Sequence, residues 1–353
     1  MYKYEHGGDV YTHDDIQIVD FSANINPLGI PNGVKQAIRN AVRDCVNYPD
    51  PFCRKLGQAT AKFLGVSQTH LYFGNGAADV LFRIALAERP KHALILAPTF
   101  ADYEKALRSV DCSIEYYRLR EEKEFMVEED ILKRITPSLD MVIICNPNNP
   151  TGQITDRALM ERLVEHCQEQ GVRLLVDECF MDFVEEKKRY SLRKMLAGHH
   201  QLVILKAFTK TFAIPGVRLG MCMTGDCKLL ERLYEVGQDW NVSVIAQKAG
   251  IAAVKEMDYL HKSMDYVSGE RAYLKKALRS LGAKVYGSEA NYIFFSLDKP
   301  SNLTSILEKK GYLIRSCKNY HNLGEGYYRI AVKTKAMNRG LIREIREARC
   351  GLY

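Results

Sequence analysis

The sequence predicts an α/β protein, with a large domain built on a mostly parallel sheet and a smaller α+β domain. Its 353 residues exceed what one minimal core needs and suit a large domain joined to a smaller one. Through the middle of the chain, short apolar runs alternate with amphipathic helices, and near-continuous Val, Ile and Leu runs are typical of strands covered on both faces. These runs lie at residues 92–98, 140–147, 172–179, 202–208 and 217–225.

The pattern changes after about residue 255. A long helical stretch is followed by two alternating strands, at 291–297 and 327–332. No internal repeat or low-complexity linker separates the parts, so we expect them to pack closely around a site. The expected division is an N-terminal arm at 1–40 that contributes to the small domain and the active site, a large cofactor-binding domain at 41–255 and a small domain at 256–353.

Composition and charge narrow the classes of partner. No apolar run approaches the roughly 20 residues of a membrane span, and no targeting segment is recognisable, so we expect a cytoplasmic protein without membrane contact. The ten cysteines are scattered without a CxxC pair, which predicts reduced thiols and no metal site. The net charge of +7 lacks a dense basic tract, which favours anionic small molecules or an ordinary solvated surface over nucleic acid.

Two polar turns follow predicted strands, where ligands gather in open α/β sheets. In LYFGNGAAD (71–79), the backbone N–H groups of Gly76, Ala77 and Ala78 could hold an anion at a helix N-terminus, although a tight turn is the commoner meaning of such glycines. In CNPNNPTG (145–152), Asn149 could donate to a ring oxygen, and an ordinary polar turn is about equally favoured.

Two charged side chains also follow predicted strands. Asp177 ends an apolar run, and its buried carboxylate would need a cationic partner such as a protonated pyridine nitrogen, unless it caps a helix. Lys210 could form an imine with an aldehyde while Thr209 and Arg218 bind a phosphate, unless it is a surface lysine. Together the four features require one ligand with an aldehyde, a ring nitrogen, a ring oxygen and a phosphate, which is pyridoxal 5'-phosphate.

The motifs GNG(A), PTFADY, NPNNPTG, VDE, and TK with an arginine eight residues later occur in this order across most of the chain. They resemble the fold type I pyridoxal-phosphate enzymes, and above all the histidinol-phosphate aminotransferase group. The resemblance implies a homodimer in which Lys210 binds the cofactor aldehyde, Asp177 pairs with the pyridine N–H, Asn149 contacts O3' and Phe100 stacks on the ring. It assigns the cofactor phosphate to Gly76, Ala77, Thr209 and Arg218, and to Tyr48 of the neighbouring subunit.

Further segments resemble the threonine-phosphate decarboxylase family of cobalamin biosynthesis. They are HGGDV (6–10), DFSANINPLG (20–29), YPDP (48–51), IPGVRLG (214–220), YLIRSCKNY (312–320) and YYRIAV (327–332). This resemblance implies decarboxylation of L-threonine O-3-phosphate to (R)-1-amino-2-propanol O-2-phosphate. It assigns the substrate carboxylate to Arg329 and the substrate phosphate to Arg315, with His6 and Asn26 closing over it and Asn149 also at the substrate.

Phe180 stands where the aminotransferase group usually has a tyrosine that donates to O3', and the decarboxylase family resembles this chain in having Phe there. Simple packing would also explain Phe180.

Three alternatives to this function stay open. The substrate could be L-serine O-phosphate, giving ethanolamine phosphate, because one methyl group is worth only about 1–3 kcal/mol. The chain could be a histidinol-phosphate-type aminotransferase. A regulator with an inactive cofactor domain is disfavoured, because only some twenty residues precede DFSANINPLG.

Overall fold

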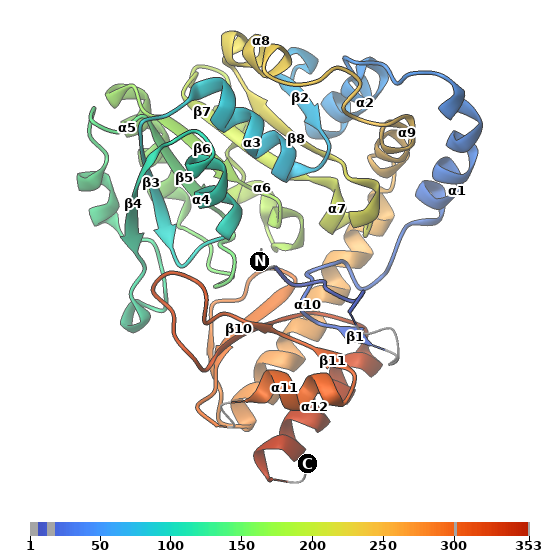
Figure 1. The fold of residues 1–353 in the computed structure, drawn as a ribbon, viewed down its shortest axis with the longest axis vertical. Coiled ribbons are helices and arrows are strands. Elements are labelled where there is room, and N and C mark those ends of the chain that lie inside the picture. The colour runs from blue at the N-terminus through green and yellow to red at the C-terminus, as the bar shows by residue number, and fades with distance from the viewer. Residues whose placement is uncertain (1–5, 13–17, 300–301, 352–353) are drawn as a thin grey trace.

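A seven-stranded sheet forms the centre of the larger lobe in the computed structural model, which describes residues 6–12, 18–299 and 302–351 (Figure 1). The strand order is β2-β8-β7-β6-β5-β3-β4, and only β8 runs against its neighbours. The strands are β2 (Leu71–Gly74), β3 (His92–Ala97), β4 (Ser113–Arg118), β5 (Met141–Cys145), β6 (Arg173–Asp177), β7 (Leu202–Ala207) and β8 (Gly220–Thr224). The predicted α/β class with a mostly parallel sheet is confirmed.

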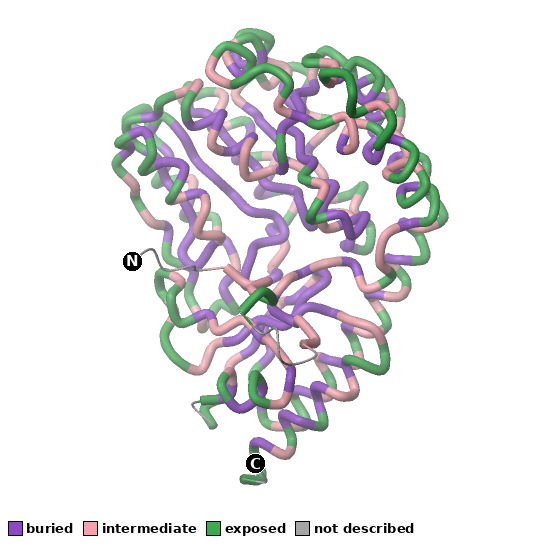
Figure 2. Tube along the Cα trace, turned by 45° about the vertical axis from the view of Figure 1, so that its right-hand side comes forward, coloured by how far each residue is buried: buried purple, intermediate pink, exposed green. Residues whose placement is uncertain are grey.

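Apolar residues cover both faces of this sheet. Along β5, Ile143 packs into one buried apolar cluster, whereas Val142 and Ile144 pack into a second cluster on the opposite face. This alternation follows from the two-residue repeat of a strand, and it explains why the strand sequences are apolar throughout. Figure 2 shows the central segments of the larger lobe coloured as buried.

Helices flank the sheet and are ended by local signals. The Asp156 carboxylate, and not Thr155, caps α5 by accepting from the N–H groups of Ala158 and Leu159, and Gly171 ends the helix at a φ of 72°. The helices of this lobe are α1 (Asn32–Ala41), α2 (Arg54–Leu64), α3 (Ala77–Glu88), α4 (Ala101–Arg108), α5 (Arg157–Gln170), α6 (Lys187–Tyr190), α7 (Phe208–Thr211), α8 (Cys227–Glu235) and α9 (Val244–Ala253). None of the helices in the described residues is both long and apolar enough to cross a lipid bilayer.

The smaller lobe is built on an antiparallel sheet of order β12-β13-β10-β9. Its elements are α10 (Met257–Ser280), β9 (Lys284–Tyr286), β10 (Tyr292–Ser296), α11 (Leu303–Lys309), β11 (Tyr312–Leu313), β12 (Arg315–Ser316), β13 (Tyr327–Ala331) and α12 (Lys335–Arg349). Strand β1 (Val19–Asp20) pairs with β11, so the N-terminal segment joins this lobe. Helix α1 instead packs on α9. The boundaries at 40 and 255 stay predictions, and residues 1–5 and 13–17 of the expected arm lie outside the described residues.

One of the contacts between the two lobes is made by Glu121, which follows β4 in the larger lobe. Its carboxylate accepts hydrogen bonds from the hydroxyls of Tyr286 and Tyr327, at 2.5 and 2.6 Å, and pairs with Lys284 at 2.9 Å. These bonds, first among them the one from Tyr286, lower the pKa of Glu121 to about 2. All three partners belong to the smaller lobe, so an ionised Glu121 ties the lobes together.

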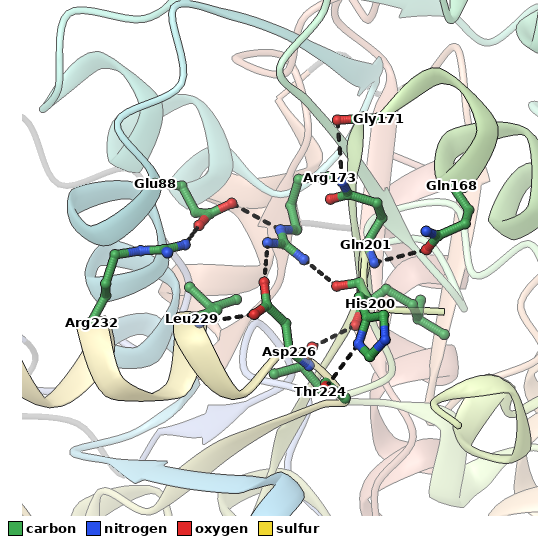
Figure 3. A network of polar contacts seen from close by, with 12 residues as sticks. Glu88, Gln168, Gly171, Arg173, His200, Gln201, Thr224, Asp226, Leu229 and Arg232 are labelled. Atoms are coloured by element: carbon green, nitrogen blue, oxygen red, sulfur yellow. Dashed lines mark hydrogen bonds and ion pairs between the residues drawn. The ribbon is translucent and has the colours of Figure 1, made fainter. Parts of the chain in front are cut away.

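The amino end of β6 carries a partly buried ion network (Figure 3). Arg173, the first residue of the strand, contacts Glu88 at 2.8 Å and Asp226 at 2.7 Å, and Glu88 also pairs with Arg232. The network ties the sheet to α3 and α8. Asp177 lies at the other end of the same strand, so these charges are remote from the predicted site.

Candidate active site

A cavity of about 250 Å³ opens at the carboxyl ends of the central strands. Its walls come from the larger lobe, from the N-terminal segment and from β12 and β13 of the smaller lobe. Most of the predicted site residues line it: His6, Ala77, Ala78, Phe100, Asn149, Asp177, Thr209, Lys210, Arg218, Arg315 and Arg329. The structure thus brings into one cavity side chains that are up to 323 positions apart in the sequence.

Lys210 lies on the short helix α7, directly after β7. It is partly buried, and burial, followed by the positive charge of Arg329, lowers the pKa of its amine from 10.5 to about 8. A much larger share of the amine is therefore neutral near neutral pH than in an exposed lysine. A neutral amine is the form that attacks an aldehyde.

Asp177 is the last residue of β6 and is 7% exposed. Each carboxylate oxygen accepts one hydrogen bond: Oδ1 from the Cys179 N–H at 2.8 Å, and Oδ2 from the Tyr103 hydroxyl at 2.5 Å. Among the described residues, no cation forms a salt bridge with this carboxylate. A buried carboxylate without a cationic partner fits a ligand that supplies one.

The glycine turn before α3 forms a tight cradle with Arg218. Gly76 has a φ of 90°, and a Cβ added to it would lie 2.6 Å from a guanidinium nitrogen of Arg218. The positive φ favours glycine at this position, and a side chain there would also displace the Arg218 guanidinium. Helix α3 begins at Ala77, so its free N–H groups and Arg218 converge on one place, as in an anion site.

Arg329 and Asn149 lie together on the wall of the cavity. Arg329 donates from one terminal nitrogen to Asn149 Oδ1 at 2.5 Å and from the other to the Ser22 carbonyl at 2.6 Å. Its Nε is buried and has no hydrogen-bond partner. A buried guanidinium with an unsatisfied N–H is suited to an incoming carboxylate.

Arg315 and Arg329 are direct cross-strand partners, on β12 and β13, and both line the cavity. Like charges directly opposite each other in a sheet are destabilising, so this pair favours a ligand with more than one negative group. Across the cavity mouth, His6 Nε2 lies 3.0 Å from Asp102 Oδ1, and the His6 ring lies 5.4 Å from that of Phe100.

The aminotransferase class I and II family matches residues 16–345. The threonine-phosphate decarboxylase of Salmonella typhimurium is 32% identical over 361 residues, which cover 100% of this chain and 98% of that protein. The chain belongs to the aminotransferase class I and II family. Its members are pyridoxal-phosphate enzymes of fold type I, which confirms the predicted fold and cofactor.

Other relatives bear different names. The adenosylcobalamin biosynthesis bifunctional protein of Leptospira interrogans is 27% identical over 353 residues, which cover 96% of this chain and 40% of that longer protein. The crystal structure of the histidinol-phosphate aminotransferase from Clostridium acetobutylicum superposes with a TM-score of 0.89 at 26% identity, covering 94% of this chain and 99% of that one. Family membership alone therefore does not separate decarboxylation from amino transfer.

The residues present fit the family's cofactor. Lys210 offers the amine, Asp177 the buried carboxylate for the ring nitrogen, and the Gly76 turn with Arg218 the phosphate cradle. Phe100 is half-buried on the cavity wall, where it can cover a ring. Phe180 packs edge-on against Tyr292, with the two ring centroids 5.0 Å apart. Because Phe180 has no hydroxyl to donate to O3', Asn149 is the candidate donor.

Three predicted residues lie outside the cavity lining of this chain: Gly76, whose turn packs against the lining residue Arg218, and Asn26 and Tyr48. Asn26 donates to the Thr211 carbonyl at 2.7 Å and to Ser263 Oγ at 2.6 Å, and its Oδ1 accepts from the Leu28 N–H, so its side chain is fully engaged. Its predicted substrate contact has no support in this geometry. Tyr48 is 78% exposed and stacks on Trp240 at 4.6 Å; its contact with a neighbouring subunit stays a prediction.

Two further residues of the site were not foreseen. Asn24, two residues before Asn26, lines the cavity, and its Oδ1 is buried without a hydrogen-bond partner. The repeated asparagine in DFSANINPLG gives no local signal that distinguishes the two. Tyr103 stands three residues after Phe100 in PTFADY, so helical spacing was the available signal for placing it near the ring.

Proposed function

We propose that this chain decarboxylates L-threonine O-3-phosphate to (R)-1-amino-2-propanol O-2-phosphate in cobalamin biosynthesis. The observation that carries the proposal is the cross-strand pair Arg315 and Arg329 on the cavity wall. An amino acid phosphate has two anionic groups for these two cations. The similarity to the Salmonella typhimurium decarboxylase along the whole chain supports the same conclusion, and the Leptospira interrogans relative supports the pathway.

The side chains divide the work. Arg329 holds the substrate carboxylate, and Arg315 holds the substrate phosphate. Asn149, which is hydrogen-bonded to Arg329, helps to position the carboxylate. Two fixed anionic groups leave the substrate one orientation, and such positioning can be worth several kcal/mol of barrier. The bound cofactor supplies an electron-accepting ring that Asp177 keeps protonated. The amine of Lys210, with a pKa of about 8, can release and return a proton near neutral pH.

The test of the reaction is a comparison of three substrates. The cofactor-loaded protein is incubated separately with threonine phosphate, serine phosphate and histidinol phosphate, and CO2 and the absorbance of the cofactor aldehyde are recorded. We expect CO2 from threonine phosphate, with the aldehyde band retained and no need for a keto acid. Faster CO2 release from serine phosphate would identify that compound as the substrate. Loss of the aldehyde band, restored by 2-oxoglutarate, would show an aminotransferase.

The proposal includes a cytoplasmic homodimer in which Tyr48 reaches the cofactor phosphate of the other subunit. Apolar side chains that are exposed near Tyr48 in the sequence, or that stack on it, support such an interface, because exposed apolar surface is typical of contact surfaces. They are Val42, Val46, Phe52 and Trp240, which are 49–86% exposed.

Mixed subunits test this arrangement. Tyr48→Ala and Lys210→Ala chains, each inactive alone, are unfolded together and refolded. A mixed dimer then carries one site with both Lys210 and the other chain's Tyr48, so we expect up to about a quarter of wild-type activity to return. No recovery from a mixture that light scattering shows to be dimeric would contradict the role of Tyr48 across the interface.

A further inference from the structure

Tyr103 connects two separate parts of the sheet below the cavity. It lies on α4, which follows β3, whereas Asp177 ends β6, and β5 runs between these two strands. The ring is fully buried, and its hydroxyl lies 2.5 Å from Asp177 Oδ2. A tyrosine that only filled space would not need its hydroxyl on this particular carboxylate.

The direction of the hydrogen bond follows from the chemistry of the two groups. An ionised carboxylate can only accept, so the Tyr103 hydroxyl must donate. Burial, followed by the negative charge of Asp177, raises the pKa of Tyr103 well above its usual value, so the hydroxyl keeps its proton. The neighbouring Cys145 and Cys179 thiols also stay neutral, because burial raises their pKa values.

Both carboxylate oxygens of Asp177 are therefore held by neutral donors. The Cys179 N–H binds Oδ1 and the Tyr103 hydroxyl binds Oδ2, which fixes the plane of the carboxylate. These two donors stabilise the negative charge that Asp177 presents to a protonated ring nitrogen. A proton shared between Asp177 and a ring nitrogen then lies closer to the ring.

We propose that Tyr103 is a positioning residue that holds the Asp177 carboxylate in one orientation, and thereby keeps the proton on the nitrogen of the cofactor ring. Tyr103 does not contact the reacting atoms in this role; it acts through Asp177. The inference rests on the cofactor and not on the identity of the substrate, so it applies to the resting enzyme before any substrate binds.

The test replaces Tyr103 by phenylalanine, which removes only the hydroxyl. Tyr292→Phe is the matched control: Tyr292 is equally buried and lines the same core, but its hydroxyl donates to the Asn148 carbonyl at 2.7 Å. Each protein is loaded with cofactor carrying ¹⁵N in the ring, and the ¹⁵N chemical shift is measured by NMR without substrate. We expect the signal of Tyr103→Phe to move toward that of an unprotonated ring, and the control signal to match the wild type.

Kinetics provide the second measurement. For Tyr103→Phe we expect kcat to fall about tenfold or more, the effect of losing a hydrogen bond to a charged group, with an unchanged KM because the substrate anions bind elsewhere. An unchanged ¹⁵N signal would overturn the proposal, and so would loss of cofactor binding, since Asp177 stays in place. If the wild type releases no CO2 from threonine phosphate, the proposed function fails while the ¹⁵N comparison still decides the role of Tyr103.

Discussion

Lys210 should cost the cofactor-free protein stability, and replacing it by methionine should therefore stabilise the fold. The amine has a pKa of about 8 in the folded chain and an ordinary value of 10.5. Burial and the charges of Arg329 and Arg218 disfavour the protonated form, which is the form present in the unfolded chain at neutral pH. Methionine has a similar length and no charge to bury.

The size of the effect follows from the two pKa values. Each pKa unit corresponds to about 1.36 kcal/mol, so the lowering from 10.5 to about 8 is equivalent to at most about 3 kcal/mol. Between about pH 8 and pH 10.5, the unfolded chain binds more protons than the folded chain, so the free energy of unfolding rises with pH. The penalty is thus fully present below about pH 8 and disappears as the pH rises to about 10.5.

Urea denaturation of the cofactor-free proteins between pH 7 and 10.5 measures this difference. We expect Lys210→Met to be more stable than the wild type at pH 7, by up to about 3 kcal/mol, and the advantage to shrink as the pH rises. Lys206→Met is the matched control, since Lys206 is also partly buried but pairs with Asp182 at 2.8 Å. Breaking that pair should destabilise the protein, by less than the roughly 3–5 kcal/mol of a fully unpaired buried charge, because Lys187 stays 3.2 Å from Asp182. A Lys210→Met protein no more stable at pH 7, or with an advantage independent of pH, would refute this reasoning.

Two more variants probe the cavity and the contact between the lobes. Arg315→Ala should lower kcat/KM for phosphorylated substrates about tenfold to a hundredfold, and should lower it less for unphosphorylated analogues. Arg343→Ala, at an exposed position of α12, is the control. An equal loss on both substrate types would contradict a phosphate contact. Glu121→Gln should lower the urea midpoint at pH 7, because the depressed pKa of Glu121 stabilises the fold above about pH 4.5. This difference from the wild type should vanish as the pH falls toward 2; a constant difference would mean that the charge of Glu121 is not what ties the lobes together.

The sequence was sufficient to predict that three of the proposed cofactor residues line one cavity. Asn149, Asp177 and Lys210 each follow a separate apolar run, and the carboxyl ends of parallel strands meet at one edge. Knowing where each strand ends was therefore enough to place these side chains together. The run at 217–225 was less well placed: β8 begins only at Gly220, because residues 215–217 form a tight turn and Arg218 has a φ of 59°.

Features that depend on strand order and register could not be predicted in the same way. The contact of Tyr103 with Asp177 depends on the strand order, in which β5 alone separates β3 from β6. No local pattern in the sequence reveals this order. Arg315 and Arg329 were assigned to the substrate by resemblance, but their direct pairing depends on the register of β12 with β13. In the irregular segment after β1, neither strand nor helix periodicity distinguishes Asn24 from Asn26, and the choice of Asn26 has no support in the fold.

The cross-strand arginine pair also bears on how the enzyme finishes its cycle. In the proposed reaction the carboxylate departs as CO2, so the amine that remains has only its phosphate to offer. Arg329 then loses its anionic partner and again faces Arg315 across the strands. The site should consequently bind the product with lower affinity than the substrate, which favours product release and limits product inhibition.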